Sequence, residues 1–270
     1  MSFLFGQGSA DGDRATEDGG CREQSRRVPF TFSTTTHSLP AKSDKFMQRY
    51  VQACAAHPNN RRIELLVDDI IADAALHARF VNTLARMEYV GVRKLLKSRR
   101  SDRLDLDGLQ HMLDENVHAL RLKKAATALA ASSGTRVATF SDDDTLAGAA
   151  GEAYLQALDH KAEAALLDLP MEKRSEANYL LTTAAIEVRA QVFYPVYDAL
   201  LSARGVGFSV AAITRDEDRH LDQMAHGLER TFGDRGGWRA RFEPLLADEQ
   251  ILFDGFLREV HRAVAIVRSA

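Results

Sequence analysis

Two copies of a short motif, Asp-Glu-x-x-His, carry the side chains of this sequence that are best suited to chemistry. The first copy spans residues 114–118 (DENVH) and the second spans residues 216–220 (DEDRH). A Glu and a His three positions apart lie on one face of a helix, so both side chains can reach the same metal ion. One Glu-x-x-His is weak evidence because it arises readily by chance, but two copies, each preceded by Asp, indicate a paired site.

A further glutamate lies upstream of each motif, on the stripe of residues that the preceding helix should turn inward. These are Glu88 and Glu187, and Glu187 fits less well because it lies farther from its turn than Glu217 does. Burying so many ionisable groups is costly without a counter-charge, and two divalent cations would balance four carboxylates. The alternative is a salt-bridged or solvated polar cluster. The predicted dinuclear metal site comprises Glu88, Glu115, His118, Glu187, Glu217 and His220.

The helices that must position these residues are recognised by apolar residues at alternating steps of three and four. The segment 61–98 has the most regular stripe and is predicted to be one continuous helix. Residues 1–42 lack periodicity and are predicted to be a flexible segment. A single helical domain should follow over 43–270, with its core bundle at about 61–231. The predicted helices cover residues 43–56, 61–98, 103–131, 145–168, 171–203, a segment beginning after Ser209 as N-cap, and 238–267.

Composition excludes several other classes of protein. The net charge of −3 gives no reason to expect a nucleic-acid partner, and the basic run 93–100 (RKLLKSRR) is interpreted as a helix C-terminus that complements its dipole. No apolar stretch is long enough to span a bilayer, and the start of the chain lacks the features of a secretory signal. Cys21 and Cys54 cannot supply a disulfide framework. We therefore expect a soluble, cytoplasmic protein without a membrane partner.

The order of the motifs resembles that of the ferritin-like di-iron carboxylate superfamily over about residues 61–231. That family places one Glu on each of two helices and a Glu-x-x-His on each of the other two. The resemblance implies an all-α fold, a ferritin-like four-helix bundle with a long crossover between its second and third helices and additional flanking helices. It also implies that Glu115 and Glu217 bridge two metal ions, each of which binds one histidine. Glu88 and Glu187 would then be terminal ligands.

The second motif has the fuller form Asp-Glu-x-Arg-His, which is similar to that of di-iron monooxygenases and acyl-carrier-protein desaturases. In those relatives the Asp orients a ligating His. The resemblance gives this role to Asp114 and Asp216, with Arg219 in the same network. His111 is either a third histidine ligand, as in the arylamine N-oxygenases, or a buried residue behind the ligands. Tyr194 is either redox-active or an ordinary tyrosine beside a bundle core.

The resemblance implies two iron ions as cofactors, with manganese or a mixed manganese–iron pair as alternatives. The favoured function is that of a non-haem di-iron oxidoreductase, which activates O2 to oxidise or oxygenate a small organic substrate. Electrons would come from an external donor, since the sequence has no motif for flavin or nicotinamide, and a homodimer is compatible with this function. One alternative is a ferroxidase or peroxide-scavenging ferritin-like protein. The other is a non-catalytic helical module that binds a partner.

Overall fold

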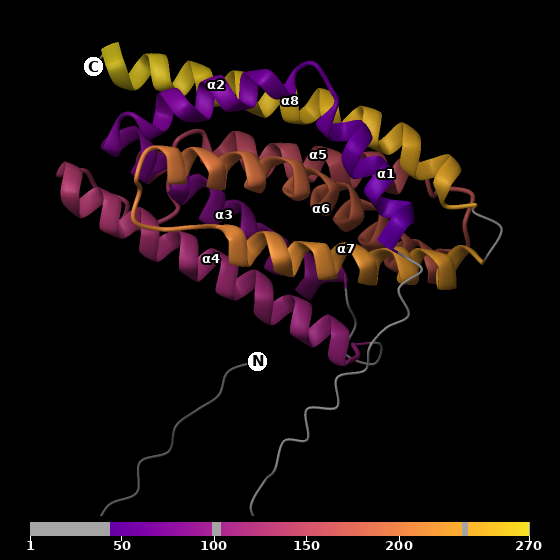
Figure 1. The fold of residues 1–270 in the computed structure, drawn as a ribbon. Coiled ribbons are helices and arrows are strands. Elements are labelled where there is room, and N and C mark those ends of the chain that lie inside the picture. The colour runs from indigo at the N-terminus through magenta and orange to yellow at the C-terminus, as the bar shows by residue number, and fades with distance from the viewer. Residues whose placement is uncertain (1–43, 99–103, 234–236, 270) are drawn as a thin grey trace, which may run out of the picture. The chain divides into compact units, whose positions relative to one another are not determined.

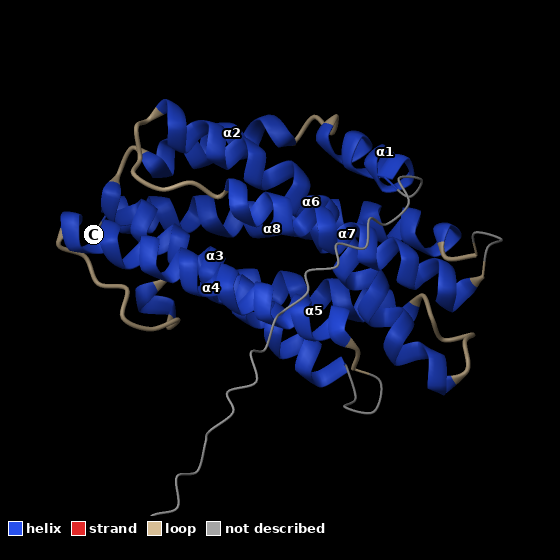
Figure 2. Ribbon diagram, turned by 60° about the horizontal axis from the view of Figure 1, so that its bottom comes forward, coloured by secondary structure: helices blue, strands red, loops and turns tan. Residues whose placement is uncertain are grey.

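The computed structural model describes residues 44–98, 104–233 and 237–269, and every regular element within these ranges is a helix (Figures 1 and 2). The predicted all-α class is therefore confirmed for this part of the chain. The predicted flexible segment 1–42 and most of the turn after residue 98 lie outside the described residues. The elements are α1 (Asp44–Ala55), α2 (Asn60–Ile71), α3 (Ala74–Ser98), α4 (Leu106–Ser133), the 3-10 turn η2 (Asp142–Asp144), α5 (Gly148–Ala164), α6 (Met171–Ala203), α7 (Ala211–Phe232) and α8 (Arg239–Ser269).

The prediction of one continuous helix over 61–98 is wrong, because the chain breaks between α2 and α3. Asp73 lies at this break, and its Oδ1 accepts hydrogen bonds from the backbone N–H groups of Ala75 at 2.9 Å and Leu76 at 3.1 Å. An aspartate in this position satisfies N–H groups that would otherwise lack a partner at the start of a helix. The stripe of apolar residues continues across the break, which is why periodicity alone did not reveal it.

Helices α3 and α4 pack along one another, and so do α6 and α7, while α4 also contacts α7 and α3 contacts α6. The inward stripes of the motif helices are those predicted from the sequence. On α4 the buried residues include His111, Glu115 and His118 at steps of four and three. On α7 Glu217 and His220 are buried in the same way. Both Glu-x-x-His motifs therefore face the interior between these four helices.

Helices α5 and α8 pack against each other, and α5 also contacts α3 and α6. A buried ion pair joins α6 to α8, since Nη2 of Arg189 lies 2.7 Å from Oε2 of Glu249. The hydroxyl of Tyr154 on α5 donates to the other oxygen of the same carboxylate at 2.8 Å. Charge-assisted bonds of this kind hold their partners in a defined geometry. They therefore hold α5, α6 and α8 together, and α3 packs against two of these helices, α5 and α6.

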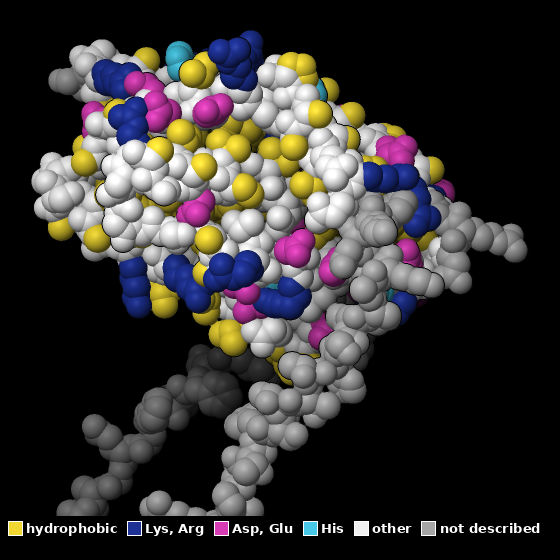
Figure 3. Space-filling view, in the orientation of Figure 1, with side chains coloured by type: hydrophobic (Ala, Val, Ile, Leu, Met, Phe, Trp, Pro, Cys, Tyr) yellow, Lys and Arg dark blue, Asp and Glu magenta, His cyan; other side chains and the backbone are white. Residues whose placement is uncertain are grey.

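On the face seen in Figure 3, charged side chains of both signs are interspersed with hydrophobic ones. No helix of the described residues is both long enough and apolar enough to cross a lipid bilayer.

Candidate metal centre

The structure brings all six predicted ligand residues together in the interior between α3, α4, α6 and α7, and adds a seventh. They form two overlapping groups, and within each group one potential ligand atom per residue lies within 4.8 Å of the others. Glu115 belongs to both groups. The first group is His111, Glu115, Glu187 and His220, and the second is Glu88, Glu115, His118 and Glu217.

The two motif histidines are each held from behind by an aspartate. Nε2 of His118 lies 3.1 Å from Oδ2 of Asp216, and Nε2 of His220 lies 3.2 Å from Oδ2 of Asp114. Each aspartate thus contacts the histidine of the other motif, so the support crosses between α4 and α7. A carboxylate behind an imidazole fixes the ring orientation and directs the other ring nitrogen forward.

Arg219 joins the two supporting aspartates. Its Nη2 donates to Oδ2 of Asp114 at 2.9 Å and to Oδ1 of Asp216 at 3.1 Å. The guanidinium presents several donors in a fixed plane, so one arginine can hold both carboxylates in place. The network predicted for Asp114, Asp216 and Arg219 is therefore present in the structure.

The forward nitrogens of the motif histidines face carboxylate oxygens. Nδ1 of His220 lies 2.8 Å from Oε2 of Glu217. Nδ1 of His118 is buried and lies 3.2 Å from Oε1 of Glu217, but it makes no hydrogen bond within the described residues. A buried imidazole nitrogen without a hydrogen bond is costly, and imidazole nitrogens beside carboxylates are the donor set that a transition-metal ion takes up when it displaces their protons. The residues present therefore fit a metal ion.

His111 is also held at one ring nitrogen and faces carboxylates with the other, although the two nitrogens exchange roles relative to the motif histidines; this favours a ligand over a residue behind the ligands. Its Nδ1 lies 2.9 Å from the hydroxyl of Tyr179, and its Nε2 faces Oε1 of Glu115 at 3.2 Å and Oε1 of Glu187 at 3.7 Å. Burial and the neighbouring His220 lower the pKa of His111 to about 3, which leaves the ring in the neutral form that binds metals. The sequence did not predict this contact of Tyr179, because His111 lies on another helix.

The four carboxyl groups of this cluster lie close together, and the two motif histidines supply too little positive charge to balance them. Burial, together with the charges of neighbouring carboxylates, raises the pKa of Glu88 and of Glu187 well above its usual range, and that of Glu115 to about 7. Burial alone would lower the pKa of His118, but the adjacent carboxylates raise it to about 10. The pKa of Glu217 is lowered, because the two motif histidines, whose Nδ1 atoms lie 3.2 Å and 2.8 Å from its oxygens, outweigh its burial. Divalent cations would supply the missing charge and allow all four carboxylates to ionise.

Two further residues shape the centre. A Cβ placed on Gly91 of α3 would lie 3.0 Å from Oε2 of Glu115, so the absence of a side chain there allows this carboxylate to approach α3. Tyr194 of α6 donates its hydroxyl proton to Oε1 of Glu88. The structure thus places Tyr194, which the sequence analysis named, directly against a candidate ligand. The importance of Gly91 could not be recognised from the sequence.

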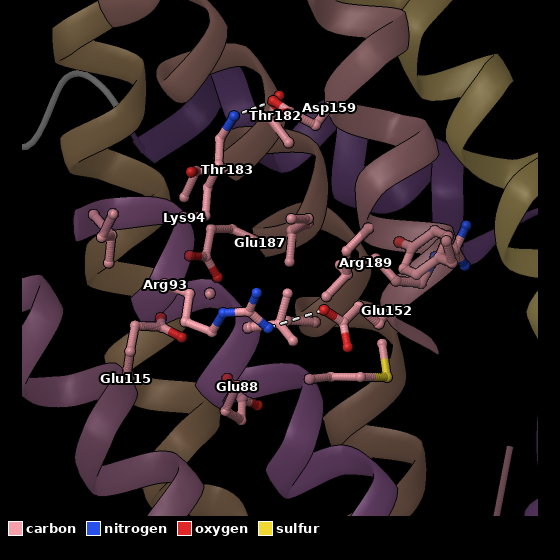
Figure 4. A pocket seen from close by; sticks show the side chains of 18 of the residues that line it. Glu88, Arg93, Lys94, Glu115, Glu152, Asp159, Thr182, Thr183, Glu187 and Arg189 are labelled. Carbon is pink, nitrogen blue, oxygen red and sulfur yellow. Dashed lines mark hydrogen bonds and ion pairs between the residues drawn. The ribbon is translucent and has the colours of Figure 1, made fainter. Parts of the chain in front are cut away.

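A cavity of about 620 Å³ lies against the centre, between α3, α5 and α6, and reaches the surface beside the C-terminal half of α3. In Figure 4 the side chains of Glu88, Glu115 and Glu187 lie next to it. A volume of this size is sufficient to bury most of a small organic molecule. The centre is therefore accessible to a ligand without unfolding of the helices around it.

No protein-family model matches this chain, and neither a curated protein nor a solved structure shows significant similarity to it. The functional evidence is therefore the geometry itself, a buried cluster of histidines and glutamates that could hold metal ions beside an open cavity.

Proposed function

We propose that this protein is a non-haem di-iron oxidoreductase that activates O2 to oxidise or oxygenate a small organic substrate. The proposed framework is a ferritin-like four-helix bundle made of α3, α4, α6 and α7, with α5 in the crossover. The observation that carries the proposal is the pair of overlapping ligand groups that share Glu115 and border a cavity of about 620 Å³. Two groups that share a carboxylate would suit two metal ions with a common ligand.

In this proposal His111, Glu187 and His220 hold one iron ion, and Glu88 and His118 hold the other. Glu115 belongs to both groups, and Glu217 contacts both motif histidines, so these two carboxylates would be shared between the ions. Mixed carboxylate and imidazole donors suit iron, and manganese or a mixed pair would be accommodated by the same groups. When bound, the ions would supply redox chemistry and open coordination positions for O2. The proposed ligands are thus His111, Glu88, Glu115, His118, Glu187, Glu217 and His220.

The protein's own groups would orient the ligands and exclude water. Asp114 and Asp216 direct the forward nitrogens of the two motif histidines into the centre, and the apolar cavity walls would keep bulk water from the reacting molecule. Tyr194 is hydrogen-bonded to Glu88, and we propose that Oε1 of Glu88 takes the hydroxyl proton when the ring gives up an electron and returns it when the external donor reduces the ring. Reducing equivalents would come from an external donor.

The cavity also separates this proposal from a metal-storage or peroxide-removal function. Residues that line it include Leu84, Leu155 and Phe193, whose apolar side chains suit an organic molecule better than a hydrated ion. Gel filtration distinguishes the two functions, because a many-subunit cage would favour storage and a monomer or dimer would favour the oxidoreductase. A non-catalytic module would retain its binding activity after the bridging glutamates are removed.

The direct experiment is reconstitution of the full-length protein with Fe²⁺ without oxygen, followed by addition of O2. We expect stoichiometric O2 uptake and a new absorption band in the wild type. Both should be lost when Glu115→Ala is combined with Glu217→Ala. Glu163→Gln, which changes an exposed carboxyl group on α5, is the control and should behave as the wild type. Equal O2 uptake by the double variant and the wild type would refute the proposed function.

A further inference from the structure

We propose that the cavity binds an amphipathic anion, a molecule with an apolar body and one anionic head group. The apolar body would lie inward toward the metal centre, and the head group would remain at the mouth beside Arg93 and Lys97 of α3. The inference rests on the proposed function only in treating this ligand as the substrate. The chemistry of the ligand itself is argued from the cavity alone.

The deep walls of the cavity are apolar. They are formed by α3, α5, α6 and α8, and they offer aliphatic and aromatic surface with few hydrogen-bonding groups. Burying an apolar body against such walls is favourable in proportion to the area removed from water. The principal apolar side chains are Leu84, Met87, Leu155, Ile186, Phe193 and Phe256.

The mouth of the cavity carries cations on one face of α3. Arg93 and Lys97 both line the cavity and both are exposed. They are four residues apart, so their side chains lie one above the other on the helix. Two exposed cations on one rim form a site for a single anionic head group.

Arg93 can leave its present partner at little cost. It donates to Oε1 of Glu152 at 2.9 Å, but Oε2 of the same carboxylate is already held by Arg86, also at 2.9 Å. Arg86 and Glu152 are mostly shielded, whereas the Arg93 side chain is 56% exposed. An exposed ion pair contributes little to stability, so Arg93 can turn to a ligand while Glu152 stays paired.

The remaining charges support the same orientation. Lys94 is paired with Asp159 across the mouth, as Figure 4 shows, so that acidic group is already neutralised. Lys97 has no ion-pair partner within the described ranges, which leaves the mouth with a surplus of positive charge. The inner end is lined instead by Glu88, Glu115 and Glu187. An anionic head group is therefore favoured at the mouth, and an amine is disfavoured there.

The test uses isothermal titration calorimetry to measure the binding of three probes, each with a ten-carbon chain, to the full-length protein with and without reconstituted iron. The probes are decanoate, 1-decanol and decyltrimethylammonium. We expect decanoate to bind more tightly than the cationic probe by about tenfold, which corresponds to about two exposed charge contacts. Combining Arg93→Gln with Lys97→Gln should weaken decanoate binding by about threefold to tenfold and leave 1-decanol within about twofold.

The control is Lys124→Gln, which removes one positive charge from an exposed position on α4 that does not line the cavity. It should leave the binding of all three probes unchanged. The inference is overturned if the cationic probe binds as tightly as decanoate. It is also overturned if decanoate binding needs iron and ignores Arg93 and Lys97, since the head group would then lie at the metals. Iron content measured on the same samples tests the proposed function separately.

Discussion

Replacing Glu115 by glutamine should have opposite effects on the stability of the fold and on metal binding. Glutamine keeps the shape of the side chain but carries no charge. In the metal-free protein the Glu115 carboxyl is buried among other carboxylates, and burial followed by the charge of Glu217 raises its pKa to about 7. Glu115→Gln removes a group that is unfavourable when ionised without metal, and it also removes the one ligand that both metal positions share.

The size and sign of the effect follow from the two pKa values. The native state holds the Glu115 proton more tightly than the unfolded chain, in which the pKa is about 4.5. The metal-free wild type therefore loses stability as pH rises from about 4.5 to 7, by up to about 1.4 kcal/mol per pH unit. By pH 8 the loss from this group is on the order of 3 kcal/mol. Glu115→Gln should lack this dependence, so its advantage over the wild type should grow with pH.

The assay is urea unfolding of chelator-treated proteins between pH 5 and pH 8, followed by circular dichroism. A pH-independent difference between Glu115→Gln and the wild type would contradict the reasoning, because the amide's own hydrogen bonding adds only a constant offset. Glu163→Gln should follow the wild type at every pH. With iron present the order should reverse, since only proteins with an intact ligand set gain stability from binding.

Three further predictions concern the groups around the ligands. Asp216→Asn should weaken metal binding by about tenfold to a hundredfold, because the substitution disturbs the orientation of His118. A change below about twofold, measured in a competition titration with a chelator, would contradict this. Tyr179→Phe removes the hydrogen bond to His111 and should weaken the binding of one ion by about fivefold, a loss of about 1 kcal/mol. An equal loss of affinity for both ions in the same titration would be inconsistent with the position of Tyr179. Gly91→Ala should crowd the carboxylate of Glu115 and lower the affinity for metal. Its control is Gly255→Ala, whose Cβ would meet nothing closer than 3.6 Å and which should change only helix propensity. Equal metal affinity in the two variants would exclude the crowding.

The sequence predicted what depends on periodicity. On α4 and α7 the spacing of His and Glu determines which face they share, so their inward direction followed from the helix alone. The same reasoning missed the break before α3, because Asp73 stabilises a new helix start without interrupting the apolar stripe. Local capping and long-range periodicity are separate signals, and the second concealed the first.

Contacts between helices were harder to predict than the faces of single helices. Glu187 looked misplaced because heights along a hairpin depend on helix ends and on how two helices slide past one another. The structure nevertheless places it beside His111 and His220. Tyr179 could not be assigned to His111, because no spacing relates residues on two different helices. The basic run that starts at Arg93 was interpreted as a helix end, and the place that we propose for Arg93 and Lys97 at the cavity mouth depends on the packing of α5 against α3.

The most direct test is the number of iron ions bound per chain after anaerobic reconstitution and removal of loosely bound metal. The overlapping ligand groups predict about two ions per chain. They also predict loss of both ions in Glu115→Ala combined with Glu217→Ala. Fewer than about one ion per chain in the wild type would contradict the proposed di-iron centre and the function built on it.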